Sequence, residues 1–384
     1  MDFTTPEEHL ALREAVRNIC SEFGQDYYVE RAEKREPTEE VWEALGKYGF
    51  IGINIPEEYG GGGAGMEELA LVCEESAAAG TPLLLTLVSS AISGEVLSAY
   101  GTEEQKQRWL PPMAAGTDKV VFAITEPDAG SNSHKISTTA RRDGDDWVLT
   151  GTKHFISGTD VAGALLVVTR TGVDEATGKA QLSLFLVDTD AVGLEKTPLP
   201  ISIGLPEWQY ILHFDNVRVP ASALVGSEGD GLKQVFHGLN PERITGAAIC
   251  VGIGRFALDK ASRYGNERNV WGQAIGAHQG VAHQLAAAKV EIELAALMTQ
   301  KAASLHSAGQ PAGEASNMAK YAAAEAALHA IDSTIQMHGG NGLATEFGLM
   351  PYWGLARLLR IAPINREMIL NYVAQHSLGL PRSY

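Results

Sequence analysis

The separation of helix-like and strand-like patterns along the chain is the strongest constraint on its fold. Near the start, apolar residues such as Leu12, Val16 and Cys20 recur at helical spacing. From Lys119 to about Val225 the pattern changes to short β-branched or alternating runs, among them VVFAI, ALLVVT and LSLFLVD. Helical patterns then return. This segregation argues against a βαβ dinucleotide-binding fold, in which strands and helices alternate.

The pattern predicts an α+β protein, mainly α, with three domains. A chain of 384 residues, 45% of them hydrophobic, is long enough to bury two or three cores. We expect a helical domain over residues 1–118, a β-barrel-like domain over 119–225 and a four-helix bundle over 226–384. Long Ala-rich segments at 244–263, 279–306 and 315–337 predict the helices of that bundle.

Two helix starts are predicted from local capping signals. Thr5 stands at a cap position, with Pro6 at the first helical position and Glu8 completing a capping box. Asn240 followed by Pro241 gives a second start of the same kind.

The net charge of -17 limits the classes of partner. Nucleic acid and anionic membrane surfaces attract a basic face, so neither is an expected partner. A phosphorylated ligand remains possible, because backbone amides and a few arginines can hold an anion on an acidic protein.

The cysteines favour a reducing compartment. Cys20, Cys73 and Cys250 are far apart, which suggests neither a disulfide framework nor a zinc knuckle. The chain begins with an acidic segment rather than a basic and then apolar signal, and it has no apolar run of membrane-spanning length. We expect a cytoplasmic protein without membrane insertion.

Residues 121–131, Val-Phe-Ala-Ile-Thr-Glu-Pro-Asp-Ala-Gly-Ser, are the most informative segment. By composition alone they are an ordinary strand that ends in a turn, with small residues that let a ligand approach the backbone. Their order, however, resembles the acyl-CoA dehydrogenase signature Thr-Glu-Pro-x-Ala-Gly-Ser. The resemblance implies an FAD site in which Thr125 contacts the flavin ring and Phe122 and Ile124 line it. It also implies that Ser131 lies at the flavin, near the CoA arm of the substrate.

A second segment, Gly-Thr-Lys-His-Phe-Ile-Ser at 151–157, is similar to the family's Gly-x-Lys-x-Trp-Ile-Thr. The resemblance implies that Phe155 packs on the flavin and that the Ser157 hydroxyl bonds near its N5 atom. Phe replaces Trp and Ser replaces Thr, both conservatively, so flavin binding is expected to survive. The change of aromatic residue alters the surface through which electrons would leave.

Two further segments resemble the parts of the family that reach the FAD of a neighbouring subunit. Residues 267–272, Glu-Arg-Asn-Val-Trp-Gly, and the later Gln279 are similar to Glu-Arg-x-x-Phe-Gly...Gln, and residues 336–342 match Gln-x-x-Gly-Gly-x-Gly. An arginine fork suits a diphosphate, although without this context Arg268 would be a solvated charge at a helix end. The resemblance implies a homotetramer, built as a dimer of dimers, in which FAD is also held by these residues: Arg268, Trp271, Gln279, Gln336, Gly339 and Gly340.

The catalytic base is predicted at Glu242. Most of the family carries its base near the C-terminus, where this chain has Pro363, and proline cannot take a proton. The isovaleryl-type and long-chain-type enzymes instead use a Leu-x-x-Glu-Arg motif, which residues 239–243 match. By the same resemblance Asn240 and Arg243 lie near the CoA side of the substrate pocket.

Simpler interpretations of these residues stay open at this stage. A glutamate at a helix start is favoured by electrostatics alone, and the helix dipole there would hold its carboxylate ionised. That pull opposes the raised pKa expected of a base for a weakly acidic carbon, so desolvation beside the thioester must offset it. Arg243 could equally be a structural ion-pair partner.

Other motifs are weak. Gly252 and Gly254 follow no strand and lack a third glycine, so a nicotinamide site is not expected. His278 and His283 are five residues apart, which is poor geometry for two ligands on one helical face, and no metal site is expected.

The resemblance implies FAD-dependent conversion of an acyl-CoA to its trans-2-enoyl-CoA, with electrons passed to an electron-transfer flavoprotein. Three alternatives remain open. The same fold could act as an enoyl-CoA reductase or as an acyl-CoA oxidase. Alternatively, given Pro363 and Phe155, it could be a catalytically silent binding subunit.

Overall fold

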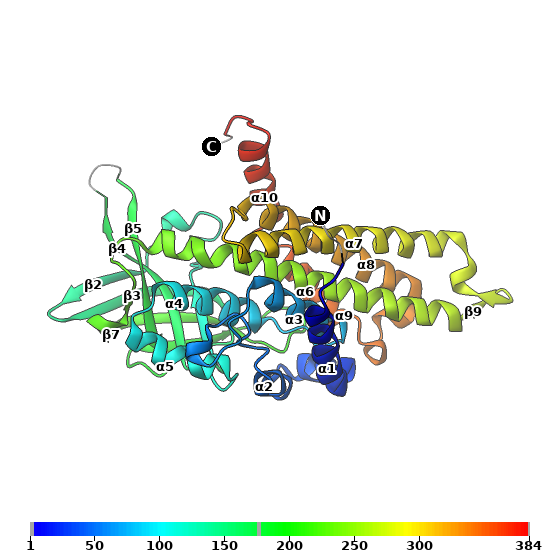
Figure 1. Ribbon diagram of the computed structural model, residues 1–384, viewed down its shortest axis with the longest axis horizontal. Coiled ribbons are helices and arrows are strands. Elements are labelled where there is room, and N and C mark those ends of the chain that lie inside the picture. The colour runs from blue at the N-terminus through cyan, green and yellow to red at the C-terminus, as the bar shows by residue number, and fades with distance from the viewer. Residues whose placement is uncertain (1–3, 175–177, 383–384) are drawn as a thin grey trace.

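The computed structural model describes residues 4–174 and 178–382, and its three regions follow the predicted order (Figure 1). The β region lies at one end of an elongated molecule, and the longest helices run away from it (Figure 1). The helices of the first region are α1 (Glu7–Lys34), α2 (Glu39–Lys47), α3 (Met66–Ala78), α4 (Gly94–Tyr100) and α5 (Glu103–Ala114). Within the described residues, no helix combines the length and the apolar character needed to cross a membrane.

The first predicted helix is confirmed, but its predicted cap is wrong. Pro6 is the N-cap of α1, and no side chain caps the helix. The Pro6 carbonyl accepts the first helical hydrogen bond, from the backbone N–H of Leu10. The apolar face of α1 is as predicted, with Val16 and Cys20 buried.

The predicted β region is an eight-stranded sheet in which the three apolar runs are β1, β4 and β5. The strands pair in the order β6-β7-β3-β2-β4-β5-β8, and β1 adds to β4 in parallel. The register of β3 against β7 shifts between Lys153 and Ile156, so His154 and Phe155 lie in a bulge. The strands are β1 (Val120–Ala123), β2 (Thr139–Asp143), β3 (Asp146–Ser157), β4 (Ala164–Val173), β5 (Ala180–Asp188), β6 (Leu194–Leu199), β7 (Gln209–Pro220) and β8 (Leu224–Val225).

The third region is built on three long helices, as the Ala-rich segments predict. Small residues let these helices approach closely: a Cβ on Gly254 of α6 would lie 2.0 Å from Ile292 of α7. A two-stranded hairpin, β9 (Asn269–Val270) with β10 (Gln273–Ala274), separates the first two helices. The helices are α6 (Gly231–Glu267), α7 (Gln279–Ser307), α8 (Gly313–His338), α9 (Met350–Leu359) and α10 (Arg366–Tyr372).

The predicted helix start at Asn240 is wrong. α6 begins at Gly231 and runs for 37 residues with Pro241 inside it. Proline lacks the N–H that would continue the helical ladder, so a break is the local preference. Burial of both flanks of this proline, including Val235 and Ile244, outweighs that preference.

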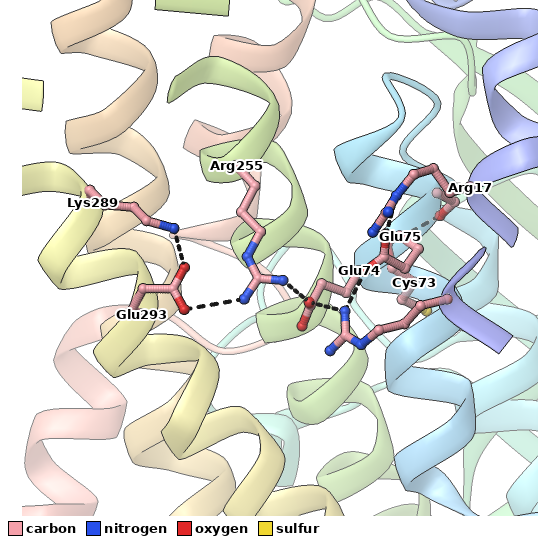
Figure 2. A network of polar contacts seen from close by, with 9 residues as sticks. Arg17, Cys73, Glu74, Glu75, Arg255, Lys289 and Glu293 are labelled. Carbon is pink, nitrogen blue, oxygen red and sulfur yellow. Dashed lines mark hydrogen bonds and ion pairs between the residues drawn. The ribbon is translucent and has the colours of Figure 1, made fainter. Parts of the chain in front are cut away.

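Charged side chains tie the first and third regions together (Figure 2). Glu74 and Glu75 at the end of α3 are buried, and both bond Arg13 of α1. Glu75 also pairs with Arg17 at 2.7 Å, and Glu74 with Arg255 of α6. These contacts satisfy the acids and fix α3 between α1 and α6.

Candidate active site

A buried ion pair holds the Thr-Glu-Pro loop against the sheet. Lys153 Nζ lies 2.9 Å from a carboxylate oxygen of Glu126 and also donates to the Ile124 carbonyl. Glu126 further accepts from Ser137 N and Oγ and from Thr138 N, at 2.6–3.0 Å. Burial raises the pKa of Glu126, but the Lys153 charge and these hydrogen bonds outweigh burial and lower it to about 2. The pair therefore fixes the loop that begins at Ile124.

Glu126 and Lys153 were not predicted as site residues. A sequence signal was present, because each is the charged residue of one of the two motifs, Thr-Glu-Pro-x-Ala-Gly-Ser and Gly-x-Lys-x-Trp-Ile-Thr, that the chain resembles. Such a residue needs a partner once it is buried, but its partner lies 27 positions away. Sequence spacing could not connect them.

The predicted ring-binding residues of β3 lie beside this loop. The backbone N–H of His154 donates to the Thr125 carbonyl at 2.8 Å. Phe155 is 56% exposed and has a φ of 58°, in the left-handed region that a bulky residue rarely adopts. Ser157 Oγ donates to Gln209 Oε1 at 2.9 Å, while Gln209 Nε2 is buried without a partner in the described residues.

This arrangement fits a flavin ring. An unpaired buried amide donor needs an acceptor, which ring carbonyls and nitrogens supply. The Ser157 hydroxyl, whose proton goes to Gln209, can still accept a hydrogen bond. The aromatic Phe155 adds an exposed apolar surface at the same bulge.

The loop and the base helix meet in one apolar cluster. Phe122 and Ile124 pack in the same cluster as Leu239 of α6. Ser131, which is exposed, accepts a hydrogen bond at 2.8 Å from Asn365 Nδ2. Phe122 of β1, Ile124 of the following loop and Leu239, three residues before Glu242, are thus brought together.

Glu242 has the surroundings that a base requires. It is 7% exposed and lies in the interior of α6, and its carboxyl has no hydrogen-bond partner among the described residues. Burial raises the pKa of its carboxyl to about 8, against the opposing charges of Arg243 and Lys320. Because the helix does not start here, its dipole does not hold the carboxylate ionised. The conflict expected from a helix-start glutamate does not arise.

Arg243 is buried rather than solvated. Its Nη1 donates to Asn240 Oδ1 at 3.0 Å, and its Nε has no partner in the described structure. Burial lowers the pKa of this guanidinium, and the charge of Glu242 raises it. A buried donor without a partner is free to take an acceptor from a ligand.

Pro363 lies in the segment that connects α9 to α10, where most of the family carries its base. Asn365 is the polar anchor of this segment. Its Oδ1 accepts from Met368 N as the cap of α10, and its Nδ2 donates to Ser131. No acidic side chain occurs between Leu359 and Arg366.

The remaining predicted residues lie at the far end of the bundle, near the β9–β10 hairpin (Figure 1). Their surfaces are open: Trp271 is 90% exposed, and a Cβ added at Gly339 or Gly340 would meet nothing within 4 Å. The helix from Glu242 to Glu267 spans roughly 37 Å at the usual rise per residue. One FAD cannot bridge both groups within a single chain. The separated residues are Arg268, Trp271, Gln279, Gln336, Gly339 and Gly340.

Comparisons with known proteins agree along the whole chain. Residues 6–117, 121–217 and 229–378 match the N-terminal, middle and C-terminal domains of acyl-CoA dehydrogenase. The chain is 57% identical over 385 residues to acyl-CoA dehydrogenase FadE12 of Mycobacterium tuberculosis, covering 100% of this chain and 99% of that protein.

Solved structures share the fold. A glutaryl-coenzyme A dehydrogenase in complex with glutaryl-CoA superimposes with a TM-score of 0.94 at 31% identity, covering 100% of this chain and 98% of the other. A glutaryl-CoA dehydrogenase of Mycobacterium smegmatis in complex with FADH2 gives 0.92 at 26% identity, covering 99% and 96%. On these matches and on its three-region architecture, the chain belongs to the acyl-CoA dehydrogenase family.

Proposed function

We propose that this protein is an FAD-dependent acyl-CoA dehydrogenase that forms a trans-2-enoyl-CoA, with Glu242 as the base. The observation that carries the proposal is one buried carboxyl, without a hydrogen-bond partner, on the stretch of α6 that packs with Phe122 and Ile124. A base works best when its pKa is near the working pH, and burial brings the pKa of Glu242 to about 8.

The chemistry assigned to this chain's own residues is proton removal and alignment. An ionised oxygen of Glu242 takes the proton from the α-carbon of the thioester, and the C–H electron pair moves into the forming double bond. Bound FAD supplies the acceptor for the hydride that leaves the β-carbon. Asn240, Arg243 and Ser131 are proposed to orient the thioester and its CoA arm, so that both hydrogens face their acceptors.

The flavin ring is proposed to lie against the loop after β1 and against the bulge of β3. Support comes from the unpaired Gln209 amide, from the exposed aromatic at the bulge, and from the Mycobacterium smegmatis relative, whose structure contains FADH2. The residues assigned to the ring are Phe122, Ile124, Thr125, Ser131, Phe155 and Ser157.

A homotetramer, built as a dimer of dimers, is proposed because the far-end residues cannot reach the same FAD. In this arrangement Arg268, Trp271 and Gln279 hold the diphosphate of a neighbour's FAD, and Gln336, Gly339 and Gly340 its adenosine end. An exposed apolar stripe on α7, formed by Val290, Leu294 and Leu297, is consistent with a subunit contact. Electrons are proposed to pass to an electron-transfer flavoprotein near Phe155.

The test is anaerobic bleaching of the purified flavoprotein by butyryl-, isovaleryl-, octanoyl- and palmitoyl-CoA. Glu242→Gln is expected to keep FAD bound and to slow bleaching by every thioester by about 10²–10⁴-fold. The matched control is Glu314→Gln, which neutralises an exposed acid on α8 and is expected to bleach like the unaltered protein. Normal bleaching in Glu242→Gln would show that another group is the base.

The electron acceptor is tested separately. Turnover with an electron-transfer flavoprotein is compared with oxygen consumption for the thioester that bleaches fastest. Faster turnover with the flavoprotein is expected; dominant oxygen consumption would make the protein an oxidase.

A further inference from the structure

Lys320 of α8 is buried in the bundle beside the base helix. It is 1% exposed, and its ammonium group donates to the carbonyl of Leu359. Its Cδ and Cε lie 3.8 and 3.7 Å from the position of a Cβ on Gly246. Gly246 is four residues after Glu242 and therefore on the same face of α6. The lysine stem thus crosses α6 one turn beyond the base.

Among the charged and titratable groups around Lys320, Glu242 is the carboxyl that the lysine charge affects most directly. They are Glu242, Arg243 and Cys250 on α6 and Glu325 on α8. Glu325 already binds Arg360 at 2.6 Å and lies 3.5 Å from Arg366.

The other two neighbours do not compete for the lysine. Burial raises the pKa of Cys250 to about 12, so the thiol is neutral at ordinary pH. Arg243 is itself a cation, and Tyr372 also acts on it electrostatically.

The hydrogen bond to Leu359 holds the ammonium group in place. Leu359 is the last residue of α9, and the segment after it leads to Asn365, which donates to Ser131 at 2.8 Å. An ammonium fixed by a backbone carbonyl keeps a constant distance to its surroundings, which makes its electrostatic effect reproducible. Burial lowers the pKa of Lys320 to about 8, and the charge of the Glu242 carboxylate opposes that change.

We propose that Lys320 is a positioning residue for the reaction: its fixed charge keeps the Glu242 carboxyl ionised in the substrate complex. The inference rests on the proposed function of Glu242 and deepens it. In the apolar bundle a cation within interaction range stabilises the ionised carboxylate more than it would in water. Without this charge the base would be protonated, and therefore inactive, over a wider range of pH.

The experiment uses 3-thiaoctanoyl-CoA bound to the FAD-loaded protein. Sulfur replaces the β-methylene in this ligand, so the ligand can lose its α-proton but has no β-hydride to give. The deprotonated ligand next to oxidised flavin is expected to give a long-wavelength charge-transfer band. The midpoint of that band between pH 5.5 and 9.5 reports how readily the site loses its proton.

Three variants separate charge from structure. Lys320→Met keeps the apolar stem, Lys320→Gln keeps a donor for the Leu359 carbonyl, and Lys320→Arg keeps the charge. Lys289→Met removes an exposed lysine of α7 and is the matched control. FAD content and thermal unfolding show whether each variant folds, and Lys320→Gln provides the test if Lys320→Met does not fold.

Both neutral variants are expected to raise the midpoint of the charge-transfer band by about one pH unit. With a substrate thioester, the same change should slow flavin bleaching roughly tenfold below the midpoint, and the rate should recover as the pH rises. Lys320→Arg is expected to return the midpoint close to that of the unaltered protein. An unchanged midpoint in folded Lys320→Met and Lys320→Gln would overturn the inference. So would a uniform loss of rate at every pH, which indicates a structural role alone.

Glu242→Gln separates this inference from the proposed function. If that variant still gives the band, Glu242 is not the base and the proposed function fails. If it gives no band at any pH while the neutral Lys320 variants titrate normally, only the role of Lys320 fails.

Discussion

Glu75 of α3 and Glu242 of α6 are both buried carboxyls on packed helices, 2% and 7% exposed, but their surroundings are opposite. Glu75 is bonded by Arg13 and by both Nε and Nη2 of Arg17 (Figure 2). The Glu242 carboxyl has no hydrogen-bond partner among the described residues, and burial raises its pKa to about 8. The first acid joins helices, whereas the second is free to exchange a proton.

Burial does not by itself turn a carboxyl into a base. Glu126 is as deeply buried as Glu75, and Lys153 with three hydrogen bonds takes its pKa down to about 2. Desolvation acts on every buried carboxyl, and the partners decide whether it is outweighed. A strongly raised pKa in an apolar site without partners is the pattern associated with function.

Replacement of the unpartnered acid, Glu242, is expected to have the largest effect. Glu242→Gln should lower the rate of flavin bleaching by about 10²–10⁴-fold, the usual contribution of acid–base catalysis. It should not lower stability, because no hydrogen bond is lost. The folded pKa lies above the unfolded value, so the protonated carboxyl contributes stability at low pH that is lost as pH rises through about 8. Urea unfolding at pH 5 and pH 9 should show a higher free energy of unfolding for the variant than for the unaltered protein only at pH 9.

Lys153→Met tests the opposite extreme by leaving Glu126 without its cation. Loss of one partner of a buried pair should lower the free energy of unfolding by about 3–5 kcal/mol. Glu126 has a lowered pKa, so its stabilisation is present above the unfolded pKa and is lost as pH falls toward about 2. Acid unfolding followed by circular dichroism should therefore begin at a higher pH in the variant.

The control is Lys196→Met, which removes an exposed lysine of β6. It should unfold like the unaltered protein. Equal acid midpoints for Lys153→Met and the control would contradict the structural role of the ion pair.

Glu75→Gln should lower the free energy of unfolding by a smaller amount, about 2 kcal/mol. The reason is that Arg17 is more than half exposed, so water can solvate its guanidinium when the carboxylate is lost. Equilibrium urea unfolding measures the loss, with the exposed Glu43→Gln as control. Flavin bleaching should be unchanged, which distinguishes this acid from Glu242. Loss of bleaching in a variant that is still folded would remove the contrast between the two helices.

Glu207 is a further buried acid to compare with Glu75 and Glu242. It is buried, neither carboxyl oxygen has a hydrogen-bond partner in the described structure, and burial raises its pKa to about 7. The protonated carboxyl contributes stability below the unfolded pKa that is lost as pH rises through about 7. Glu207→Gln should thus be more stable than the unaltered protein at pH 8 and equally stable at pH 4. Equal thermal midpoints for variant and unaltered protein at pH 8 would mean that this acid is partnered after all.

Much of the architecture could be predicted from the sequence, because periodicity is a property of neighbouring residues. The buried face of α1 and the start of α7 at Gln279 are examples. The start of α6 could not be predicted. Asn240 and Pro241 are good local signals for a helix start, but ten helical residues precede Pro241, and Val235 and Gly238 among them are buried.

In the candidate site, too, some features could be predicted from the sequence and others could not. The motif around Glu242 and the loop from Thr125 to Ser131 could be recognised by the order of their residues. The pairing of Glu126 with Lys153, of Ser157 with Gln209 and of Lys320 with Leu359 could not, since the partners are 27, 52 and 39 residues apart.

The order of the three regions, the buried face of α1 and the identity of the candidate base could be inferred from the amino-acid sequence alone. Only the tertiary structure decided whether that base could work, by placing it inside a helix rather than at its start and by leaving its carboxyl without a hydrogen bond. The physical reason is range: backbone preferences act between near neighbours in the chain. The protonation state of a buried acid depends instead on whichever distant residues folding brings within a few ångströms of it.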